Sequence, residues 1–160
     1  MILVAVSTGH FDPLIEACSR LGSRYAFLGQ IGSGTVVPPF PHFRTAPPEE
    51  IERRMAEAEL VVTHAGTGML SQLYRLTKRT VVVPKQSRYG ESNDGQVELA
   101  RKWAELGICT LCMDVDRLGE AIEKCRESTP HFPRLPSLGA HFRDLLGLSS
   151  VSAGVSSRGK

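Results

Sequence analysis

The chain has 160 residues, of which 41% are hydrophobic and 22% are charged, and its formal net charge is +2. This length and composition are typical of one soluble globular domain that buries its core without disulfides or metal. The near-neutral charge excludes the broad basic surface of a nucleic-acid binder, and no apolar run approaches the ~20 residues of a membrane-spanning helix.

Strand-like and helix-like segments alternate along the first 127 residues. In chain order, we expect a strand at Ile2–Ser7, a helix capped by Asp12 with Pro13 at its first position, a strand at Tyr25–Leu28, loops with a strand fragment or two over Gly29–Arg44, and a helix at Pro47–Ala58. There follow a strand at Leu60–Thr63, a helix at Gly66–Leu76, a strand at Thr80–Val83, a helix at Asp94–Leu106, a strand at Ile108–Cys112 and a helix at Asp116–Arg126.

Strands that alternate with helices of this length predict a parallel sheet with helices on both faces, a Rossmann-like α/β domain over residues 1–127. The apolar start, Met1–Val6, ends at Ser7 and follows no basic segment, so we expect a buried first strand rather than a signal peptide, and a cytoplasmic protein. Residues 128–148 predict a proline-containing linker followed by a short helix at Leu138–Leu148, and residues 149–160 predict a disordered tail.

The chain has four cysteines, and Cys109 and Cys112 have the CxxC spacing of half a metal site or of a redox pair. They lie in a strand-like run, where residues three apart point to opposite faces, and the sequence has neither a second CxxC nor a His pair at zinc spacing. We therefore expect reduced structural thiols and no metal site.

Three loops follow strands, where a parallel sheet binds its ligands. Ser7–His10 offers backbone N–H groups at a helix N-terminus, and His10 is a weak candidate for a general base or simply a solvated side chain. His64–Gly68 carries two glycines before a helix and matches neither a dinucleotide fingerprint nor a P-loop, so it is either an anion site or only a tight turn.

The third loop, Pro84–Gln96, is dense in amides and carboxylates that hydrogen-bond sugar hydroxyls. The alternative is a solvated loop whose Asp94 caps the following helix. The glycine-rich run Gly29–Gly34 is assigned only to loop structure.

In this order, the segments Phe11–Ile15, Gln30–Gly32, His64–Gly68, Pro84 with Arg88–Glu91, and Asn93–Gln96 resemble the C-terminal, donor-binding domain of family 28 glycosyltransferases. The likeness covers about residues 1–127 and is strongest to the one-domain subunits of bacterial exopolysaccharide synthesis of the PssE and EpsF type, which are related to the C-terminal half of MurG.

This resemblance implies one half of an inverting GT-B glycosyltransferase. Such a subunit binds a UDP-sugar and no metal or other cofactor, and it pairs at the inner membrane with a membrane-associated subunit that binds a lipid-linked saccharide acceptor and supplies the base. Gly66, Thr67 and Gly68 would face the phosphates, Gln72 the ribose, and Asn93, Asp94 and Gln96 the sugar. The full donor-binding set would be Thr8, Gly9, His64, Gly66, Thr67, Gly68, Gln72, Tyr89, Glu91, Asn93, Asp94 and Gln96.

Two positions depart from the family pattern. Gln72 replaces an acidic residue, and Gly95 stands where a His is common in a sugar loop one residue shorter than usual. Lys85 and Arg88 suit an acidic sugar such as glucuronate, so the transferred group is a hexose or a hexuronate. Two alternatives remain: a non-catalytic nucleotide-binding regulatory module of the same fold, and a small stand-alone enzyme using His10 and Ser7.

Overall fold

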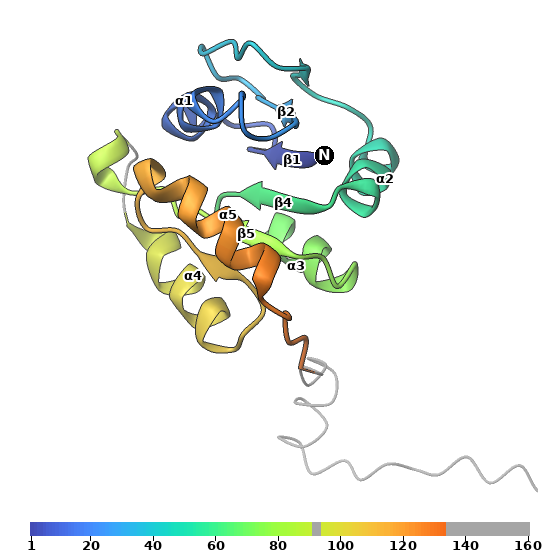
Figure 1. Ribbon diagram of the computed structural model, residues 1–160, viewed down its shortest axis with the longest axis vertical. Coiled ribbons are helices and arrows are strands. Elements are labelled where there is room, and N and C mark those ends of the chain that lie inside the picture. The colour runs from blue at the N-terminus through green and yellow to red at the C-terminus, as the bar shows by residue number, and fades with distance from the viewer. Residues whose placement is uncertain (91–93, 134–160) are drawn as a thin grey trace, which may run out of the picture.

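A computed structural model of the chain describes residues 1–90 and 94–133. At its centre lies a parallel six-stranded sheet with the order β3-β2-β1-β4-β5-β6 (Figure 1). The strands are β1 (Ile2–Ala5), β2 (Phe27–Gln30), β3 (His42–Phe43), β4 (Leu60–Thr63), β5 (Thr80–Val82) and β6 (Thr110–Leu111). This strand order confirms the expected Rossmann-like sheet. The two outermost strands, β3 and β6, have only two residues each.

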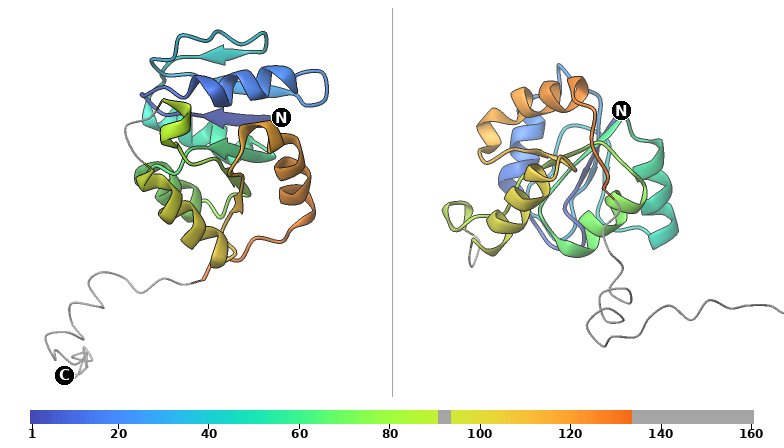
Figure 2. Two further views of the ribbon diagram at one scale, coloured as in Figure 1. Left: turned by 90° about the vertical axis from the view of Figure 1, so that its left-hand side faces the viewer. Right: turned by 90° about the horizontal axis from the view of Figure 1, so that it is seen from below.

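Helices cover both faces of the sheet, as the continuously apolar strands predict (Figure 2). On one face, α1 (Asp12–Arg20) and α5 (Leu118–Glu127) pack against residues such as Val4 and Val62. On the other face lie α2 (Pro48–Glu57), α3 (Thr67–Arg75) and α4 (Gly95–Glu105), which contact residues such as Leu3, Val61 and Val82.

The predicted bounds of β2 are wrong by two residues at each end. The sequence predicts Tyr25–Leu28, but the Tyr25 backbone N–H donates to Leu21 O at 3.1 Å and closes the turn after α1 instead. Gly29 joins the strand because its N–H pairs with Pro41 O at 2.9 Å. A Cβ at Gly29 would lie 2.9 Å from the Phe40 ring, so the absence of a side chain lets Phe40 cover the strand.

The start of the last helix also differs from the prediction of Asp116. A 3-10 turn, η2 (Val115–Arg117), comes first, and α5 begins at Leu118. The turn forms because the Asp114 carboxylate accepts the Asp116 backbone N–H at 3.0 Å.

The cysteines confirm the expected opposite-face arrangement. Cys112 packs in the core beneath α1 and α5, whereas Cys109 packs on the opposite face with Trp103 and Leu70. All four thiols are free, and burial raises the pKa of Cys109 to about 12 and that of Cys112 to about 11. Within residues 1–90 and 94–133, no three His, Cys, Asp or Glu side chains gather as metal ligands would.

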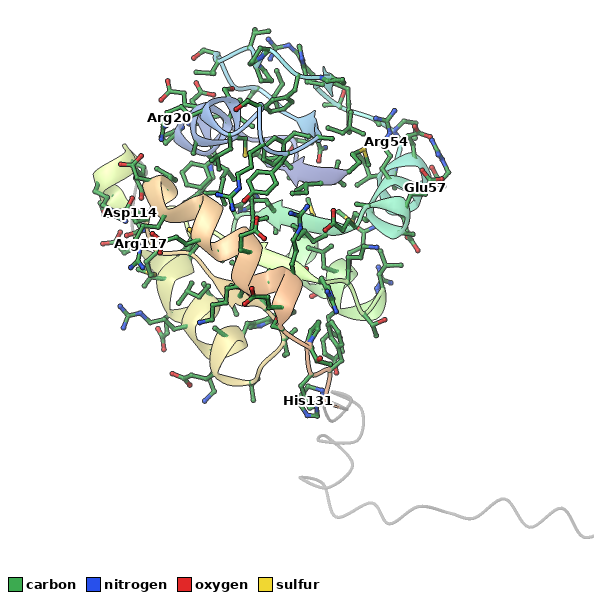
Figure 3. All side chains as sticks on the ribbon, in the orientation of Figure 1. Arg20, Arg54, Glu57, Asp114, Arg117 and His131 are labelled. Atoms are coloured by element: carbon green, nitrogen blue, oxygen red, sulfur yellow. The ribbon has the colours of Figure 1, made fainter. Side chains whose placement is uncertain are left out.

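The chain after α5 packs back on the domain as far as residue 133. The His131 backbone N–H donates to Gly107 O at 2.9 Å, and Figure 3 shows His131 at the lower end of the domain. The Tyr74 hydroxyl donates to Pro133 O, and the Tyr74 ring lies 6.0 Å from the rings of both Phe132 and Trp103. The predicted helix over residues 138–148 and the predicted tail over residues 149–160 lie outside the described residues.

The edge of the sheet at which the strands begin is closed by charged side chains. Glu123 of α5 accepts from the Tyr25 hydroxyl at 2.6 Å, and Arg126 of the same helix pairs with Glu59 at 2.7 Å. Among the helices of the described segments, none is both long and apolar enough to cross a bilayer.

Candidate functional site

The opposite edge, at which the strands end, brings the predicted loops together. In this strand order the chain leaves β1 toward one side of the sheet and β4 toward the other, and ligands bind at such a switch point. Ser7–His10 follows β1 and His64–Gly66 follows β4, so these two loops flank the switch point. The third loop follows β5, the next strand of the sheet.

The first loop, Ser7–His10, is exposed over Thr8, Gly9 and His10. The Gly9 carbonyl accepts the Ser33 backbone N–H at 2.9 Å. Gly32 has a φ of +52°, and a Cβ there would lie only 2.0 Å from Gly9 O. The glycine-rich run assigned only to loop structure therefore supports the first loop, and Gly32 is required for the close approach.

The prediction that Asp12 caps α1 is wrong. Asp12 is the first residue of the helix, the N-cap is Phe11, and no side chain caps this end. The Asp12 carboxylate instead accepts the Thr35 hydroxyl at 2.6 Å and the Thr35 backbone N–H at 3.0 Å. Partial burial raises the pKa of Asp12, but the hydrogen bonds from Thr35 outweigh burial and hold the pKa below its ordinary value.

Sequence analysis did not single out Arg44, which lies at the same edge of the sheet. It follows β3, and its guanidinium donates to Gly32 O at 3.0 Å and to Gly34 O at 2.9 Å. Gly34 in turn leaves room for Asp12, because a Cβ at Gly34 would lie 2.5 Å from the carboxylate. No local signal marks Arg44, since its role depends on β3 pairing beside β2.

The second loop, His64–Gly68, leads into α3 without a side-chain cap. The N-cap is Gly66, and the first turn carries no acidic residue. Within residues 1–90 and 94–133, the first backbone N–H groups of the helix therefore have no capping side chain, and such groups can bind an anion. Thr67 and Gly68 are exposed, and a Cβ at Gly68 would meet nothing within 4 Å.

Gly66 has a different role from Gly68. Its φ of −78° is open to any residue, but a Cβ there would lie 2.4 Å from Cε1 of the His64 ring. The His64 ring thus occupies the place that a side chain at residue 66 would need. The sequence interpretation, in which both glycines face the ligand, stays a prediction for Gly66 and Gly68.

Gln96, the second residue of α4, joins the second and third loops. Its Oε1 accepts the Ala65 backbone N–H at 3.0 Å and the Lys85 backbone N–H at 3.2 Å, and it lies 3.3 Å from Nδ1 of His64. This carboxamide therefore fixes the ends of the loops that follow β4 and β5.

Asp94 occupies the N-cap position of α4, but its side chain does not cap the helix. The carboxylate accepts the Ser87 backbone N–H at 2.7 Å and so closes the third loop on itself. Glu91 and Asn93, also predicted to bind the donor, lie outside the described residues.

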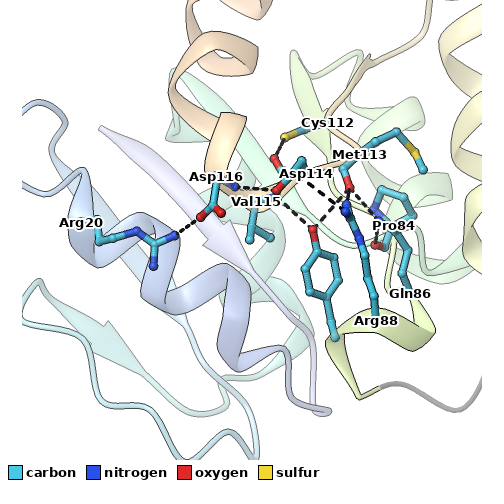
Figure 4. A network of polar contacts seen from close by, with 10 residues as sticks. Arg20, Pro84, Gln86, Arg88, Cys112, Met113, Asp114, Val115 and Asp116 are labelled. Atoms are coloured by element: carbon cyan, nitrogen blue, oxygen red, sulfur yellow. Dashed lines mark hydrogen bonds and ion pairs between the residues drawn. The ribbon is translucent and has the colours of Figure 1, made fainter.

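Arg88 connects the third loop to the segment that follows β6 (Figure 4). Tyr89 contacts the same segment. The Tyr89 hydroxyl accepts the Val115 backbone N–H at 3.1 Å, and its ring lies 5.8 Å from that of Phe11. Arg88 donates to Met113 O and lies 3.6 Å from the Asp114 carboxylate. Both side chains thus have structural partners at this edge.

Gln72 and His10 are the remaining predicted residues. Gln72, half-buried in α3, donates from Nε2 to Glu52 of α2 at 3.4 Å. Within the described residues, no hydrogen bond joins His10 to an acidic side chain, and Asp12 is engaged by Thr35. Two cavities of about 240 and 270 Å³ lie along β6 and α5.

Two solved structures share this fold. The glycotransferase of kitacinnamycin matches 79% of this chain and 35% of its own, with a TM-score of 0.60 and 21% identity. MurG from Acinetobacter baumannii matches 91% of this chain and 51% of its own, with a TM-score of 0.58 and 15% identity. The chain therefore spans between about a third and a half of these proteins, and its fold is that of one Rossmann-like half of a GT-B glycosyltransferase.

The sequence itself matches a family. No curated protein matches the chain. The model of the glycosyltransferase family 28 C-terminal domain matches residues 45–137, which is more than half of the chain and includes the second and third loops. The chain therefore belongs to the glycosyltransferase family 28 C-terminal domain family.

Proposed function

We propose that this chain is the UDP-sugar-binding subunit of a split, inverting glycosyltransferase. The observation that carries the proposal is the uncapped N-terminus of α3 at the switch point of the sheet, inside the segment that matches the family. A helix N-terminus with free N–H groups stabilises a diphosphate without a metal ion. The exposed backbone of Thr67 and Gly68 leaves room for that group.

The exposure of the first two loops supports a second protein body. Thr8, Gly9 and His10 are exposed on one side of the switch point, and Thr67 and Gly68 on the other. Glycosyl transfer needs water excluded from the reacting carbon and a base for the acceptor hydroxyl. We propose that a membrane-associated subunit of the exopolysaccharide type covers this edge, supplies the base and binds the lipid-linked saccharide.

In this proposal the chain holds the leaving group. The N–H groups of α3 stabilise the negative charge that develops on the diphosphate as the bond to the sugar breaks. The acceptor attacks from the opposite side of the anomeric carbon, so its configuration inverts. A hexose or a hexuronate fits the polar third loop, and the charge of Lys85 favours a carboxylated sugar.

The test is a thermal shift of the whole chain with UDP, UDP-glucose, UDP-galactose, UDP-N-acetylglucosamine and UDP-glucuronate. A ligand at a hundredfold excess over its Kd raises the free energy of unfolding by about 2.7 kcal/mol. Thr67→Pro is the variant expected to reduce the ligand-induced shift. It removes one N–H at the first position of α3, where proline fits the helix. Glu16→Ala, at an exposed site on α1, is the control.

No shift with any of these nucleotides would refute the donor site. Binding without sugar transfer in the presence of the acceptor-binding subunit would instead favour the regulatory module.

A further inference from the structure

We propose that Gln96 is a positioning residue for the nucleotide part of the ligand. It fixes two loops and the tautomer of His64, and these in turn position the nucleotide. The proposal rests on the function proposed above and deepens it. The family resemblance implies that Gln96 faces the donor sugar, whereas we expect Gln96 to influence the binding of UDP alone, which carries no sugar.

The side-chain oxygen of Gln96 is saturated by donors from the protein. Gln96 Oε1 receives the N–H groups of Ala65 and Lys85 at 3.0 and 3.2 Å and faces Nδ1 of His64 at 3.3 Å. A carbonyl oxygen has two lone pairs, so the two backbone N–H groups and the imidazole share them. No lone pair of Oε1 remains for a ligand.

The carboxamide of Gln96 has one orientation. Backbone N–H groups need an acceptor, and the amide nitrogen of glutamine cannot accept. The two backbone donors therefore fix which end of the Gln96 carboxamide faces the loops. Nε2 is the end left over, and it makes no hydrogen bond within the described residues.

Because Nδ1 of His64 faces an acceptor, the neutral ring carries its proton on Nδ1. The ring lies against Gly66, where a Cβ would be 2.4 Å from Cε1, so both the position and the tautomer of the imidazole are set. Only Ala65 separates His64 from Gly66, the N-cap of α3, and the hydrogen bond from Ala65 to Gln96 fixes the chain between them.

These contacts predict different outcomes for two substitutions. Gln96→Glu keeps an oxygen for all three donors, replaces the Nε2 donor with a second oxygen and adds a negative charge. Gln96→Leu has a similar size and removes every hydrogen bond of the side chain. We expect Gln96→Glu to bind UDP within about threefold of the wild-type affinity, and Gln96→Leu to bind it at least tenfold more weakly, which is about 1.4 kcal/mol. Glu98→Gln, at an exposed position of the same helix, is the matched control.

A second measurement needs no ligand and is not moved by a merely structural loss. Nitrogen-15 chemical shifts of the His64 imidazole in the free, full-length protein distinguish the two tautomers. We expect the Nδ1–H form in the wild type and in Gln96→Glu, and a mixture of tautomers in Gln96→Leu.

An Nε2–H tautomer in the wild-type protein would overturn the proposal even if Gln96→Leu fails to fold. Equal UDP affinities of a folded Gln96→Leu variant and the wild type would overturn it as well. If the wild-type protein binds no UDP, the proposed function fails, while the tautomer measurement still decides whether Gln96 positions His64.

Discussion

Gly68→Ala, within α3, and Gly66→Ala, just before it, should have opposite effects on stability. Gly68→Ala adds a methyl group that meets nothing within 4 Å in the free protein, at a helical position without positive φ. Alanine is favoured over glycine in a helix, so the variant should be more stable by about 0.4–1 kcal/mol. For a protein of this size the gain corresponds to a Tm higher by roughly 1–4 °C.

The same methyl group stands where we propose that the diphosphate approaches the backbone. A displaced or lost hydrogen bond to a charged group costs about 1.5–3 kcal/mol, so UDP affinity should fall by roughly ten- to a hundredfold. Calorimetric titration with UDP measures the affinity, and differential scanning calorimetry measures the Tm. A Gly68→Ala variant that is more stable and binds UDP more weakly would show that Gly68 is needed for the ligand contact and not for folding.

Gly66→Ala is the matched comparison. Its methyl group would lie 2.4 Å from His64 Cε1, so the ring must leave Gln96 or the loop must shift. Overpacking of this kind costs about 1–3 kcal/mol, and the Tm should fall. A Gly68→Ala variant that binds UDP like the wild type, or that unfolds at a lower temperature, would refute this division of roles.

Three further predictions concern the rest of the domain. The folded state lowers the pKa of Asp12, so its carboxylate stabilises the protein above pH ~4 and loses that contribution as the pH falls through the folded pKa. The difference in urea midpoint between the wild type and Asp12→Asn should therefore be smaller at pH 3 than at pH 6. An equal difference at both pH values would contradict this. With pKa values of about 12 and 11, Cys109 and Cys112 should react slowly with iodoacetamide at pH 8 in the native protein and rapidly in urea, as mass spectrometry can show. Stoichiometric labelling of the native protein would contradict these raised pKa values. Phe132→Ala should expose Trp103, the single tryptophan, and shift its fluorescence emission to longer wavelength, whereas an unchanged spectrum would mean that the segment after α5 does not cover it.

The sequence allowed the sheet to be predicted because parallel strands buried on both faces leave a strong local pattern. The apolar runs at β1, β4 and β5 each give that pattern without reference to any other part of the chain. Helix caps were less predictable, because a short acidic side chain accepts from whichever donor the fold brings near. Asp12 bonds to Thr35 and Asp94 to Ser87, so neither caps its helix.

The site shows the same division between local and distant causes. The second loop is recognisable because its glycines and its position after a strand lie within a few residues. The support given by Gly32 to Gly9, and by Arg44 to Gly32, depends on how three strands are ordered in the sheet. The residues adjacent to Gly32 and Arg44 in the sequence do not indicate that strand order.

The two-residue edge strands also affect how the domain behaves in a crowded solution. An edge strand exposes unpaired backbone groups that can recruit a strand from another molecule, and long edges are therefore sites of aggregation. At β3 and β6 a foreign strand could pair along only two residues of regular strand. Sheets built from distant, parallel pairings tend to fold slowly and expose their edges for longer. Short edges therefore favour a chain that stays dispersed while its sheet assembles.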